Sequence, residues 1–410
     1  MMRCRHCGGT DFIPFLDLGE APPSNSYLDA ADLSRPEKRY PLVIRTCTEC
    51  WLTQTEDFAD REEFFSGDYA YFSSFSKTWL DHARAYVASM RDRFALGPDS
   101  LVAEVAANDG YLLQYAREFG IPCYGVEPTR STAETARARG IEIVEEFFGR
   151  ELADSLAADG RQADLIAANN VLAHVPDIND FVGGFATLLK PGGVATFEFP
   201  HLYEMVRGNQ FDTAYHEHYS YLSLLSVKRI FAANGLTVFD VETTPHHGGS
   251  LRVFACRSDH AAHQVTPAVE AMLDTERRAG MDGPDFYSGF QATAEAARDG
   301  FRGFLAEARA AGLKVAAYGA AAKGNTLLNF AGVDAGDIAF VVDRNPAKQG
   351  RFMPGSHVPI VGEDRLTSDQ PDRVVILPWN IETEIRTQLT FISDWGGQFV
   401  TAIPKLATRS

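Results

Sequence analysis

The chain has 410 residues, more than one hydrophobic core normally supports, so we expect two or three domains. Its net charge of −17 argues against a general binder of nucleic acids or anionic membranes, although backbone amides and a few cations can still hold an anionic small ligand. No apolar run approaches the roughly 18 residues of a membrane span, and the start "MMRCRHCGG" lacks the apolar core of a signal peptide. We therefore expect a cytoplasmic monomer with no nucleic-acid or membrane partner.

Four of the six cysteines form two C-x-x-C pairs near the beginning of the chain, "CRHC" and "CTEC". In a long chain without an export signal, a metal site is favoured over a disulfide framework. Four thiolates complete the tetrahedral shell of a structural zinc ion, whereas a pair of redox dithiols is the alternative. His6 could compete as a ligand, but two complete pairs leave it no vacancy. The predicted zinc ligands are Cys4, Cys7, Cys47 and Cys50.

The middle of the chain alternates strands and helices. Residues 77–97 have helical spacing and end at a glycine, and the next stretch reads strand, tight turn, helix, strand, turn and helix. This alternation predicts a parallel, doubly wound sheet. The first turn, "EVAANDG", follows a strand that ends at Glu104. The second strand ends at "GVEPT", which places Glu127 where an acid can accept hydrogen bonds from the hydroxyls of an adenosine ribose.

The first turn matches the common methyltransferase pattern E/D-x-G-x-G-x-G only weakly, because Gly110 is the one glycine that remains. Taken alone, it leaves NAD binding open. Three later blocks favour S-adenosylmethionine (SAM): the strand and turn "ADLIAANNVLAHVPD", the segment "LLKPGGVATFEFP", and the helix "VKRIFAANGL". Short-chain nicotinamide enzymes usually show Y-x-x-x-K, which no convincing helix here contains. The predicted SAM-binding residues from these blocks are Glu104, Ala106, Asn108, Gly110, Glu127, Pro128, Asn169 and Asn170.

The last third of the chain roughly repeats the middle. Residues 265–310 look helical, with breaks at "GMDGPD", and "LKVAAYGAAAKGNTLLNFAG" then predicts another strand, turn and helix. Lys323 stands where the first copy has Asp109, and a lysine at a helix N-terminus suits a phosphate. A purely structural unit with a surface lysine is the alternative. The predicted substrate-binding residues are Lys323, Asn325, Asp343 and Arg344.

The motifs, taken in order, resemble a known family. They are the two cysteine pairs, "CWLTQ", "DYAYFSSFS", "EVAANDGYLL", "GVEP", "NNVLAHVPD", "YHEHYSYLS", "HHGGSLR" and "GAAAKGNTLLN". This set, which spans nearly the whole chain, resembles the SAM-dependent C-methyltransferases of nucleotide-linked keto-deoxysugars, the makers of branched antibiotic sugars such as tetronitrose and kijanose. One departure is Trp51, where the family usually has glycine, and we expect it to alter the local turn.

The resemblance implies an α/β protein of three parts. A small zinc-binding domain (1–68) precedes a class I SAM methyltransferase domain with a Rossmann-like fold (69–258). A second Rossmann-like domain (259–410) helps to bind the nucleotide-sugar. The cofactors are SAM and a structural zinc ion. The implied substrate is a 4-keto sugar, usually linked to thymidine diphosphate, that is methylated on the carbon beside the ketone, most often C-3.

Methylation beside a ketone needs a base at the carbon and a donor near the oxygen of the enolate. The resemblance points to His218 as the base and Tyr215 as the donor, while Glu217 orients a neighbour or binds substrate. His174 holds the ketone or serves as an alternative base, and Tyr69 closes over SAM or the sugar. In a strand, Tyr215 and His218 would face opposite sides, so this segment must be a turn or loop if both serve one carbon.

Several alternatives remain open at this stage. The same fold could serve a nicotinamide-dependent nucleotide-sugar epimerase or reductase. A non-catalytic zinc-knuckle adapter, or methyl transfer to oxygen or nitrogen, would also fit parts of the pattern. We interpret His216, Tyr219 and Tyr221 as packed residues. A zinc protease is excluded separately, because H-E-H lacks the H-E-x-x-H spacing of such a site. The sequence does not separate C-3 from C-5.

Overall fold

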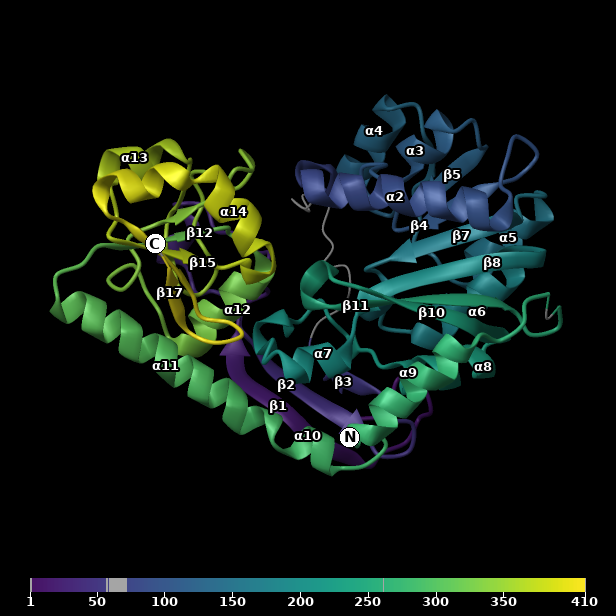
Figure 1. Ribbon diagram of the computed structural model, residues 1–410, viewed down its shortest axis with the longest axis horizontal. Helices are drawn as coiled ribbons and strands as arrows, with labels where there is room; N and C mark the ends of the chain where they lie inside the picture. Colours follow the sequence, from purple (N-terminus) through teal and green to yellow (C-terminus); the bar gives the residue numbers. More distant parts are fainter. Residues whose placement is uncertain (1, 57, 59–71, 261, 410) are drawn as a thin grey trace.

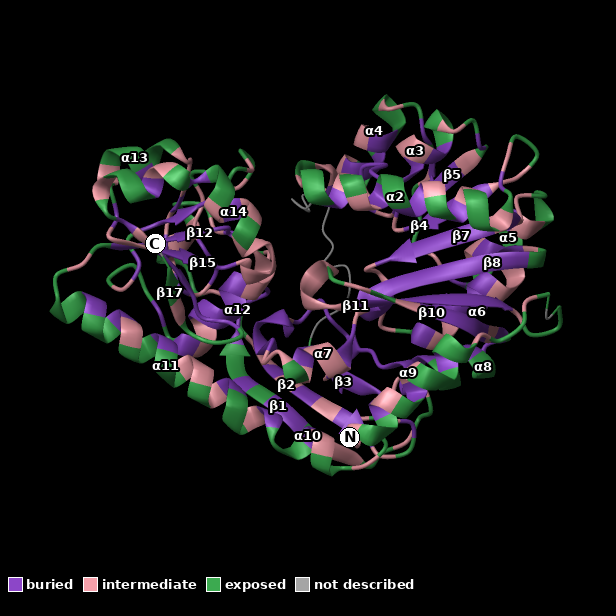
Figure 2. Cartoon of the chain, in the orientation of Figure 1, coloured by how far each residue is buried: buried purple, intermediate pink, exposed green. Residues whose placement is uncertain are grey.

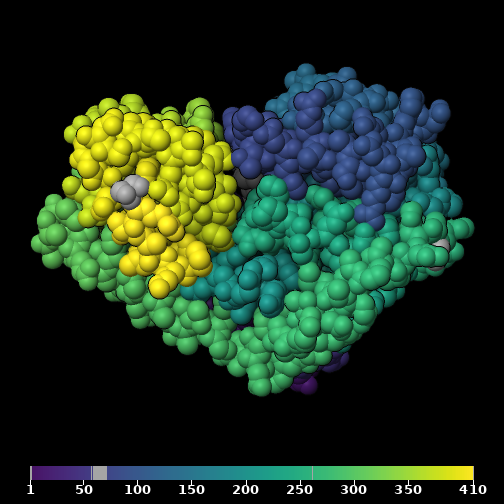
Figure 3. All heavy atoms as spheres, in the orientation of Figure 1, coloured from purple at the N-terminus to yellow at the C-terminus, as the bar shows by residue number. Residues whose placement is uncertain are grey.

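A computed structural model describes residues 2–56, 58, 72–260 and 262–409 of the chain. Figure 1 shows two α/β lobes side by side, with the first strands of the chain between and beneath them. Figure 3 shows the same lobes as a space-filling surface, joined below by a band of helices from the chain's last third. Among the described residues, no helix is long and apolar enough to cross a membrane.

The N-terminal part forms an antiparallel sheet of four strands in the order β1-β2-β3-β9. The first three strands are β1 (Phe12–Ala21), β2 (Tyr40–Cys47) and β3 (Thr53–Thr55). The fourth, β9 (Ser220–Tyr221), comes from far along the chain, directly after the histidine-rich segment. The sheet whose first two strands lie between the two cysteine pairs is therefore completed by the predicted catalytic region.

The right-hand lobe of Figure 1 is built on a sheet of seven strands in the order β10-β11-β8-β7-β4-β5-β6. Its strands are β4 (Val102–Val105), β5 (Cys123–Val126), β6 (Glu142–Val144), β7 (Ala163–Asn169), β8 (Leu189–Pro200), β10 (Leu236–Thr244) and β11 (Ser250–Arg257). All neighbouring pairs from β6 to β8 are parallel, and only β11 runs against its neighbours. This arrangement confirms the predicted doubly wound sheet.

Helices cover both faces of this sheet, because its strands are apolar on both sides. Ala103 of β4 packs into the core with α5 (Arg150–Ala158), α6 (Ile178–Leu188) and α8 (Leu224–Ala233). Its neighbour Val102 packs into a separate core with α2 (Lys77–Phe94), α3 (Leu113–Glu118) and α4 (Arg130–Ala138). Figure 2 shows the strands buried between these helices. Helix α2 ends before the predicted Gly97, because Ala95 takes the left-handed conformation with φ of 50° that stops a helix.

The left-hand lobe contains the predicted second strand, turn and helix. Helices α9 (Pro267–Arg278), α10 (Asp285–Ser288) and α11 (Phe290–Ala310) run beneath both lobes and lead into it (Figure 1). Its sheet contains β14 (Ile360–Val361), β13 (Val341–Val342), β12 (Val315–Tyr318), β15 (Arg373–Ile376), β16 (Gln398–Thr401) and β17 (Ala407–Arg409), in that order. Only β17 is antiparallel. Helices α12 (Ala322–Ala331), α13 (Asp364–Asp369) and α14 (Glu382–Gln388) complete the lobe.

Trp51 follows the second cysteine pair, where we expected an altered local turn. Its backbone takes a φ of 62°, the left-handed region that glycine favours, and its N–H donates to the Cys47 carbonyl at 2.9 Å. Its ring stacks on Tyr287 of α10, with ring centroids 5.8 Å apart and planes 3° apart. The stacking offsets the strain of a bulky residue in this conformation.

Candidate active site

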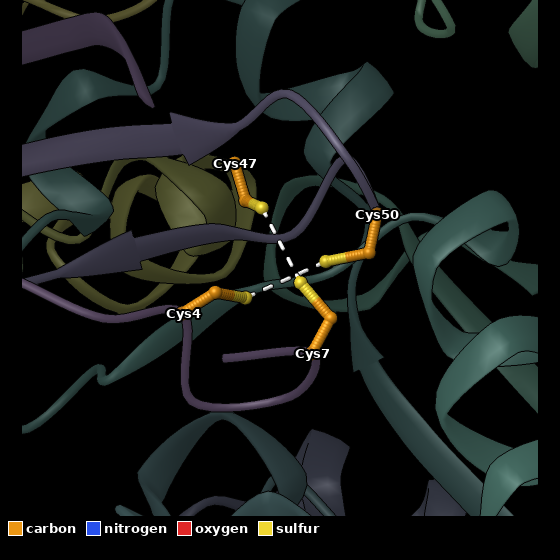
Figure 4. A group of neighbouring side chains, drawn as sticks. All are labelled: Cys4, Cys7, Cys47 and Cys50. Atoms are coloured by element: carbon orange, nitrogen blue, oxygen red, sulfur yellow. Dashed lines mark hydrogen bonds between the residues drawn. The ribbon is translucent and has the colours of Figure 1, made fainter. Parts of the chain in front are cut away.

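The four cysteines of the C-x-x-C pairs point at one centre (Figure 4). The sulfur atoms of Cys4 and Cys50 lie 3.5 Å apart, and those of Cys7 and Cys47 lie 3.6 Å apart. All four sulfurs lie within 4.8 Å of one another. A tetrahedral ion with bonds of about 2.3 Å requires sulfurs about 3.8 Å apart. The spacing and the four-thiolate donor set therefore fit zinc, and no ligand position is left open for a reacting water.

The residues around the cysteines join this site to the methyltransferase-like lobe. Gln54 of β3 donates through Nε2 to the Cys4 sulfur at 3.2 Å and accepts the Arg5 N–H at 3.0 Å. Arg5 donates to the carbonyl of Pro176 in the other lobe at 3.0 Å. His6 is not a ligand, because its Nδ1 lies 2.9 Å from Asn179 Oδ1 and it is not one of the four clustered residues. Zinc thus stabilises a surface that packs directly on the adjacent lobe.

The turn after β4 has the left-handed backbone of a glycine-rich loop, although Gly110 is the one glycine of the pattern that it contains. Ala106 and Asn108 take φ values of 61° and 49°, and Gly110 takes 78°. At Gly110 an added Cβ would lie 2.3 Å from the Ile141 side chain, so glycine is required there for packing as well as conformation. Although "EVAANDG" matches the glycine-rich pattern only weakly, Ala106, Asn108 and Gly110 all take the left-handed conformation that glycine favours.

Buried acceptor oxygens gather at the carboxyl ends of the neighbouring strands. Both carboxylate oxygens of Glu104, on β4, lack a hydrogen-bond partner among the described residues, as do the Oδ1 atoms of Asn169 and Asn170 after β7. Burial, reinforced by the charges of Asp109 and Glu127, raises the pKa of Glu104 well above its usual value. Such a set of unsatisfied acceptors suits a ligand that brings positive charge and N–H donors, and SAM carries both.

Glu127 lies at the end of β5, as predicted. Its Oε2 accepts the Asn108 N–H at 2.9 Å and its Oε1 accepts the Thr129 N–H at 2.9 Å. These bonds fix the carboxylate at the same sheet edge as the turn after β4. Pro128, the next residue, is half-buried. The residues predicted to bind SAM therefore lie along one edge of the sheet, except Tyr69, which lies outside the described residues.

The segment just before α2 is fastened to this turn. The Ser73 N–H donates to Asn108 Oδ1 at 2.9 Å, and the Ser74 hydroxyl bonds the Asp109 carboxylate. Arg139, at the end of α4, donates to the Asp109 carbonyl at 2.7 Å and to the Ser74 hydroxyl at 2.9 Å. The part of "DYAYFSSFS" that the structure describes, from Phe72 onward, thus packs against the predicted cofactor loop.

The histidine-rich segment forms a turn, as its chemistry required. The His218 N–H donates to the Tyr215 carbonyl at 2.9 Å, and the two rings lie in tilted contact, with centroids 3.9 Å apart and planes 33° apart. His218 is buried, and its Nδ1 lies 2.9 Å from the Thr213 carbonyl. A carbonyl only accepts, so Nδ1 carries the proton and Nε2 keeps the lone pair in the neutral ring. Burial, together with His174, holds the pKa of His218 well below its usual range.

His174 follows β7 in a short 3-10 turn (Leu172–His174) and faces His218, with ring centroids 4.6 Å apart. Its Nδ1 lies 2.9 Å from the Glu217 carbonyl, which fixes the same tautomer as in His218. Burial lowers the pKa of His174 to about 4. The structure therefore brings both predicted histidines together, in neutral form, and Glu217 orients one of them through its backbone.

The Glu217 side chain reaches the N-terminal part of the chain. Asn25, in the turn-rich segment after β1, donates through Nδ2 to both carboxylate oxygens, at 2.9 and 2.7 Å. Burial raises the pKa of Glu217 to about 7, and the bonds from Asn25 oppose this rise. Next to it, the Tyr27 hydroxyl donates to the Ala320 carbonyl of the C-terminal lobe at 2.5 Å. The segment around Asn25 thus connects three parts of the molecule.

The sequence analysis did not predict a role for Asp212, which lies beside the turn that carries Tyr215 and His218 (called the catalytic turn after its predicted role). Asp212 is buried, and Trp379 donates to its Oδ2 through Nε1 at 2.8 Å. Burial raises the pKa of Asp212 to about 6, while the charge of Lys323 opposes the rise. Lys323 itself donates to Asn380 Oδ1 at 2.8 Å and lies 4.9 Å from the Trp379 ring centre. Lys323 is therefore directed at the catalytic turn, and not only at the solvent side of its helix.

The other predicted substrate residues lie in the C-terminal lobe at different depths. Asn325 is buried on α12, and its Nδ2 has no hydrogen-bond partner among the described residues. Asp343, after β13, accepts the N–H groups of Ala320 and Asn345, both at 2.8 Å. Arg344 is mostly exposed and lies 3.7 Å from Glu363. The structure brings Asn325 and Asp343 near the turn between β12 and α12, while Arg344 lies at its outer edge.

The segment "HHGGSLR" borders the predicted cofactor site. His247 takes a φ of 54°, and its Nε2 lies 3.2 Å from Asn170 Nδ2. His246 stacks against His82 of α2, with ring centroids 3.9 Å apart. Among the packed residues, His216 lies 3.1 Å from the Tyr40 carbonyl through Nε2, and Tyr219 and Tyr221 are buried. His247 therefore holds the side chain of Asn170. The sequence analysis did not predict this role.

The strand order, the reversed β11 and the acceptor-lined edge define a class I SAM-dependent methyltransferase joined to a zinc-binding domain and a further α/β domain. Three family descriptions match the chain. "Putative zinc binding domain" covers residues 4–65, "Methyltransferase domain" covers 79–241, and "C-methyltransferase C-terminal domain" covers 245–404. The cofactors are SAM and zinc, as predicted.

Comparisons with individual proteins found relatives that match different shares of the chain. C-methyltransferase NovU of Streptomyces niveus is 35% identical over 402 residues, which are 98% of this chain and 95% of that protein. A ubiquinone biosynthesis O-methyltransferase of Chelativorans sp. (strain BNC1) is 30% identical over 94 residues, 23% of this chain and 37% of that protein. A structure of Burkholderia thailandensis 1,6-didemethyltoxoflavin-N1-methyltransferase shares 18% identity and a TM-score of 0.36, covering 52% of this chain and 97% of its own. The chain belongs to the family of C-methyltransferases that includes NovU. The nicotinamide-enzyme and adapter interpretations are thereby set aside.

Proposed function

We propose that this C-methyltransferase acts on a nucleotide-linked 4-keto-deoxysugar, with thymidine diphosphate as the nucleotide, and methylates C-3 beside the ketone in the synthesis of branched antibiotic sugars. The proposal is supported mainly by the pair of neutral histidines, His218 and His174, whose ring tautomers are both fixed by backbone carbonyls. They lie beside Tyr215, within reach of the charge of Lys323 from the C-terminal lobe. The resemblance seen in the sequence supplies the sugar and the nucleotide.

The tautomer of His218 makes its Nε2 a proton acceptor. Because the Nδ1–H donates to the Thr213 carbonyl, the lone pair of Nε2 can take a proton from carbon. The lowered pKa of His218 keeps the ring neutral but also makes it a weak base. A weak base removes a C–H proton only if the enolate oxygen is strongly stabilised. The chemistry therefore depends on the donors that surround the oxygen as much as on His218.

The neighbouring groups divide the remaining tasks. Tyr215, in tilted contact with His218, donates its hydroxyl toward the sugar oxygen, and His174, whose Nε2 is likewise a proton acceptor, serves as the alternative base. Glu217, with its pKa near 7, binds a sugar hydroxyl while its backbone carbonyl fixes His174. SAM, held by the residues at the edge of the sheet, supplies the electrophilic methyl group. Buried walls from Tyr219 and Tyr221 exclude water from the reacting carbon.

Each of the three proposed domains binds a different component of the reaction. Residues 1–68 hold zinc and supply Asn25, residues 69–258 hold SAM and the histidines, and residues 259–410 hold the nucleotide end of the substrate. Asn325 and Asp343 lie at the turn after β12, where parallel α/β sheets bind ligands. Arg344 at the outer edge is placed for the diphosphate, whose charge is exposed to solvent. Tyr69 remains proposed as a closing residue.

Mass spectrometry tests the proposed function. The enzyme is incubated with SAM and a thymidine-diphosphate-linked 4-keto-6-deoxysugar, and the product is fragmented to locate the added mass. We expect the gain of one methyl group on the ring carbon beside the ketone. A methyl group found only on oxygen, or no transfer to any 4-keto sugar, would reject the proposal.

A further inference from the structure

Lys323 comes from the C-terminal lobe but lies against the catalytic turn of the other lobe. It stands in the first turn of α12, and its Nζ donates to Asn380 Oδ1 at 2.8 Å. The Trp379 ring flanks the ammonium at 4.9 Å. Trp379 in turn donates to the Asp212 carboxylate, three residues before Tyr215. The ammonium is therefore held in a fixed place by a hydrogen bond and an aromatic face.

Helix α12 is fastened to the catalytic turn by independent contacts. The Thr326 hydroxyl donates to the carbonyl of Ala214 at 2.7 Å, directly before Tyr215. The rings of Phe330 and Phe211 pack edge to face, with centroids 5.5 Å apart. Because the middle and the last turn of α12 are tied to the segment directly before Tyr215, the position of Lys323 relative to His218 is set by packing and not by a flexible side chain alone.

The surroundings of Lys323 suit a ligand oxygen that is neutral when it binds and becomes an anion during the reaction. Lys323 is close enough to His218 and His247 for its charge to lower the pKa of both, while Asp212 faces it with a carboxyl group. A diphosphate placed here would be repelled by the Asp212 carboxylate that faces Lys323. A ketone oxygen carries little charge before reaction and gains a full charge on enolisation, so a fixed cation stabilises the transition state more than the bound substrate.

We propose that Lys323 is a catalytic residue whose ammonium holds the ketone oxygen and carries the charge of the enolate when His218 removes the neighbouring proton. This inference rests on the proposed function. The carbon–hydrogen bond breaks, its electron pair forms the new carbon–carbon double bond, and the carbonyl π pair moves onto oxygen. The proton goes to His218 Nε2, and the Nζ–H of Lys323 donates to the resulting oxyanion. The C-terminal lobe thereby completes the active site.

Solvent deuterium exchange of the substrate tests this step without SAM. The wild-type enzyme should exchange the C–H beside the ketone for deuterium, which proton NMR follows directly. Lys323→Met should slow this exchange by about 10²–10³-fold, the usual loss for one oxyanion donor, and slow kcat for methylation equally. The KM for the nucleotide-sugar should change little. Lys314→Met is the matched control, because Lys314 precedes β12 at the opposite end of the strand and pairs with Asp369.

The outcomes separate the two proposals. Exchange by Lys323→Met at the wild-type rate, with only KM raised, would show that Lys323 binds phosphate and would overturn the inference while keeping the proposed function. Absence of both exchange and methylation in the wild-type enzyme would overturn the proposed function itself. Thermal unfolding and SAM titration confirm that each variant folds, and Lys323→Gln, which keeps a polar side chain, replaces Lys323→Met if the latter does not.

Discussion

Binding of SAM should release a proton from Glu104. Neither of its carboxylate oxygens has a partner among the described residues, and its burial raises the pKa well above the usual value, so the unliganded protein holds this carboxyl protonated over a window above its ordinary pKa of about 4.3. A cation bound beside it favours the ionised form and lowers that pKa. The dissociation constant of SAM should therefore fall as the pH rises through this window, by at most about tenfold per pH unit.

The size of the effect can be estimated by treating the Glu104 carboxylate as one charged hydrogen-bond acceptor for SAM. A hydrogen bond to a charged group contributes about 1.5–3 kcal/mol, so Glu104→Gln should weaken SAM binding roughly 10- to 100-fold and remove its pH dependence. Isothermal titration calorimetry in two buffers of different ionisation enthalpy counts the released protons directly. Glu142→Gln is the control, since Glu142 is an exposed carboxylate of the same sheet. Equal affinity at every pH, with no proton released by the wild-type protein, would refute the assignment of Glu104 to SAM.

Three further predictions concern the base, the bridging asparagine and the zinc site. His218→Asn should lower kcat by roughly 10²–10⁴-fold while SAM affinity stays the same, and full turnover would transfer the role of base to His174. Asn25→Ala removes hydrogen bonds that favour the ionised form of Glu217, so the pKa of Glu217 should rise above about 7. The limb of the pH profile of kcat/KM that reports Glu217 should then move to higher pH. An unmoved profile would contradict this prediction. Cys47→Ser should lose the zinc ion and part of the roughly 10 kcal/mol of folding free energy that such ions supply. Metal analysis should show the loss of zinc, and thermal unfolding should show a lower unfolding temperature, whereas Cys123→Ser, the control, should keep its zinc. Stoichiometric zinc in Cys47→Ser would contradict this prediction.

Local patterns predicted the parts of the site that lie within short segments. The cysteine pairs, the turn after β4 and the histidine turn each depend on residues that are neighbours in the chain. Their geometry therefore follows from spacing and from the allowed backbone conformations. The pattern search undervalued the turn after β4, because it looks for glycine, whereas Ala106 and Asn108 reach the same left-handed conformation at some cost in strain.

Contacts between lobes could not be predicted in this way. Asn25 meets Glu217, and Trp379 meets Asp212, only after three parts of the chain have packed together. No periodicity links such distant positions, so a single sequence carries little signal for them. Asp212 lies three residues before the motif "YHEHYSYLS", and no partner was predicted for it. The pairing of β9 with β3 was likewise invisible, since two-residue strands have no period of their own.

The account depends most on carbon being the atom that is methylated. The most direct measurement uses SAM labelled with carbon-13 in its methyl group and a thymidine-diphosphate-linked 4-keto-6-deoxysugar, followed by NMR of the product. The account predicts a methyl signal at the chemical shift of a carbon-bound methyl group, with one-bond coupling to the ring carbon beside the ketone. A signal at the shift of a methoxy group, without carbon–carbon coupling, would contradict it.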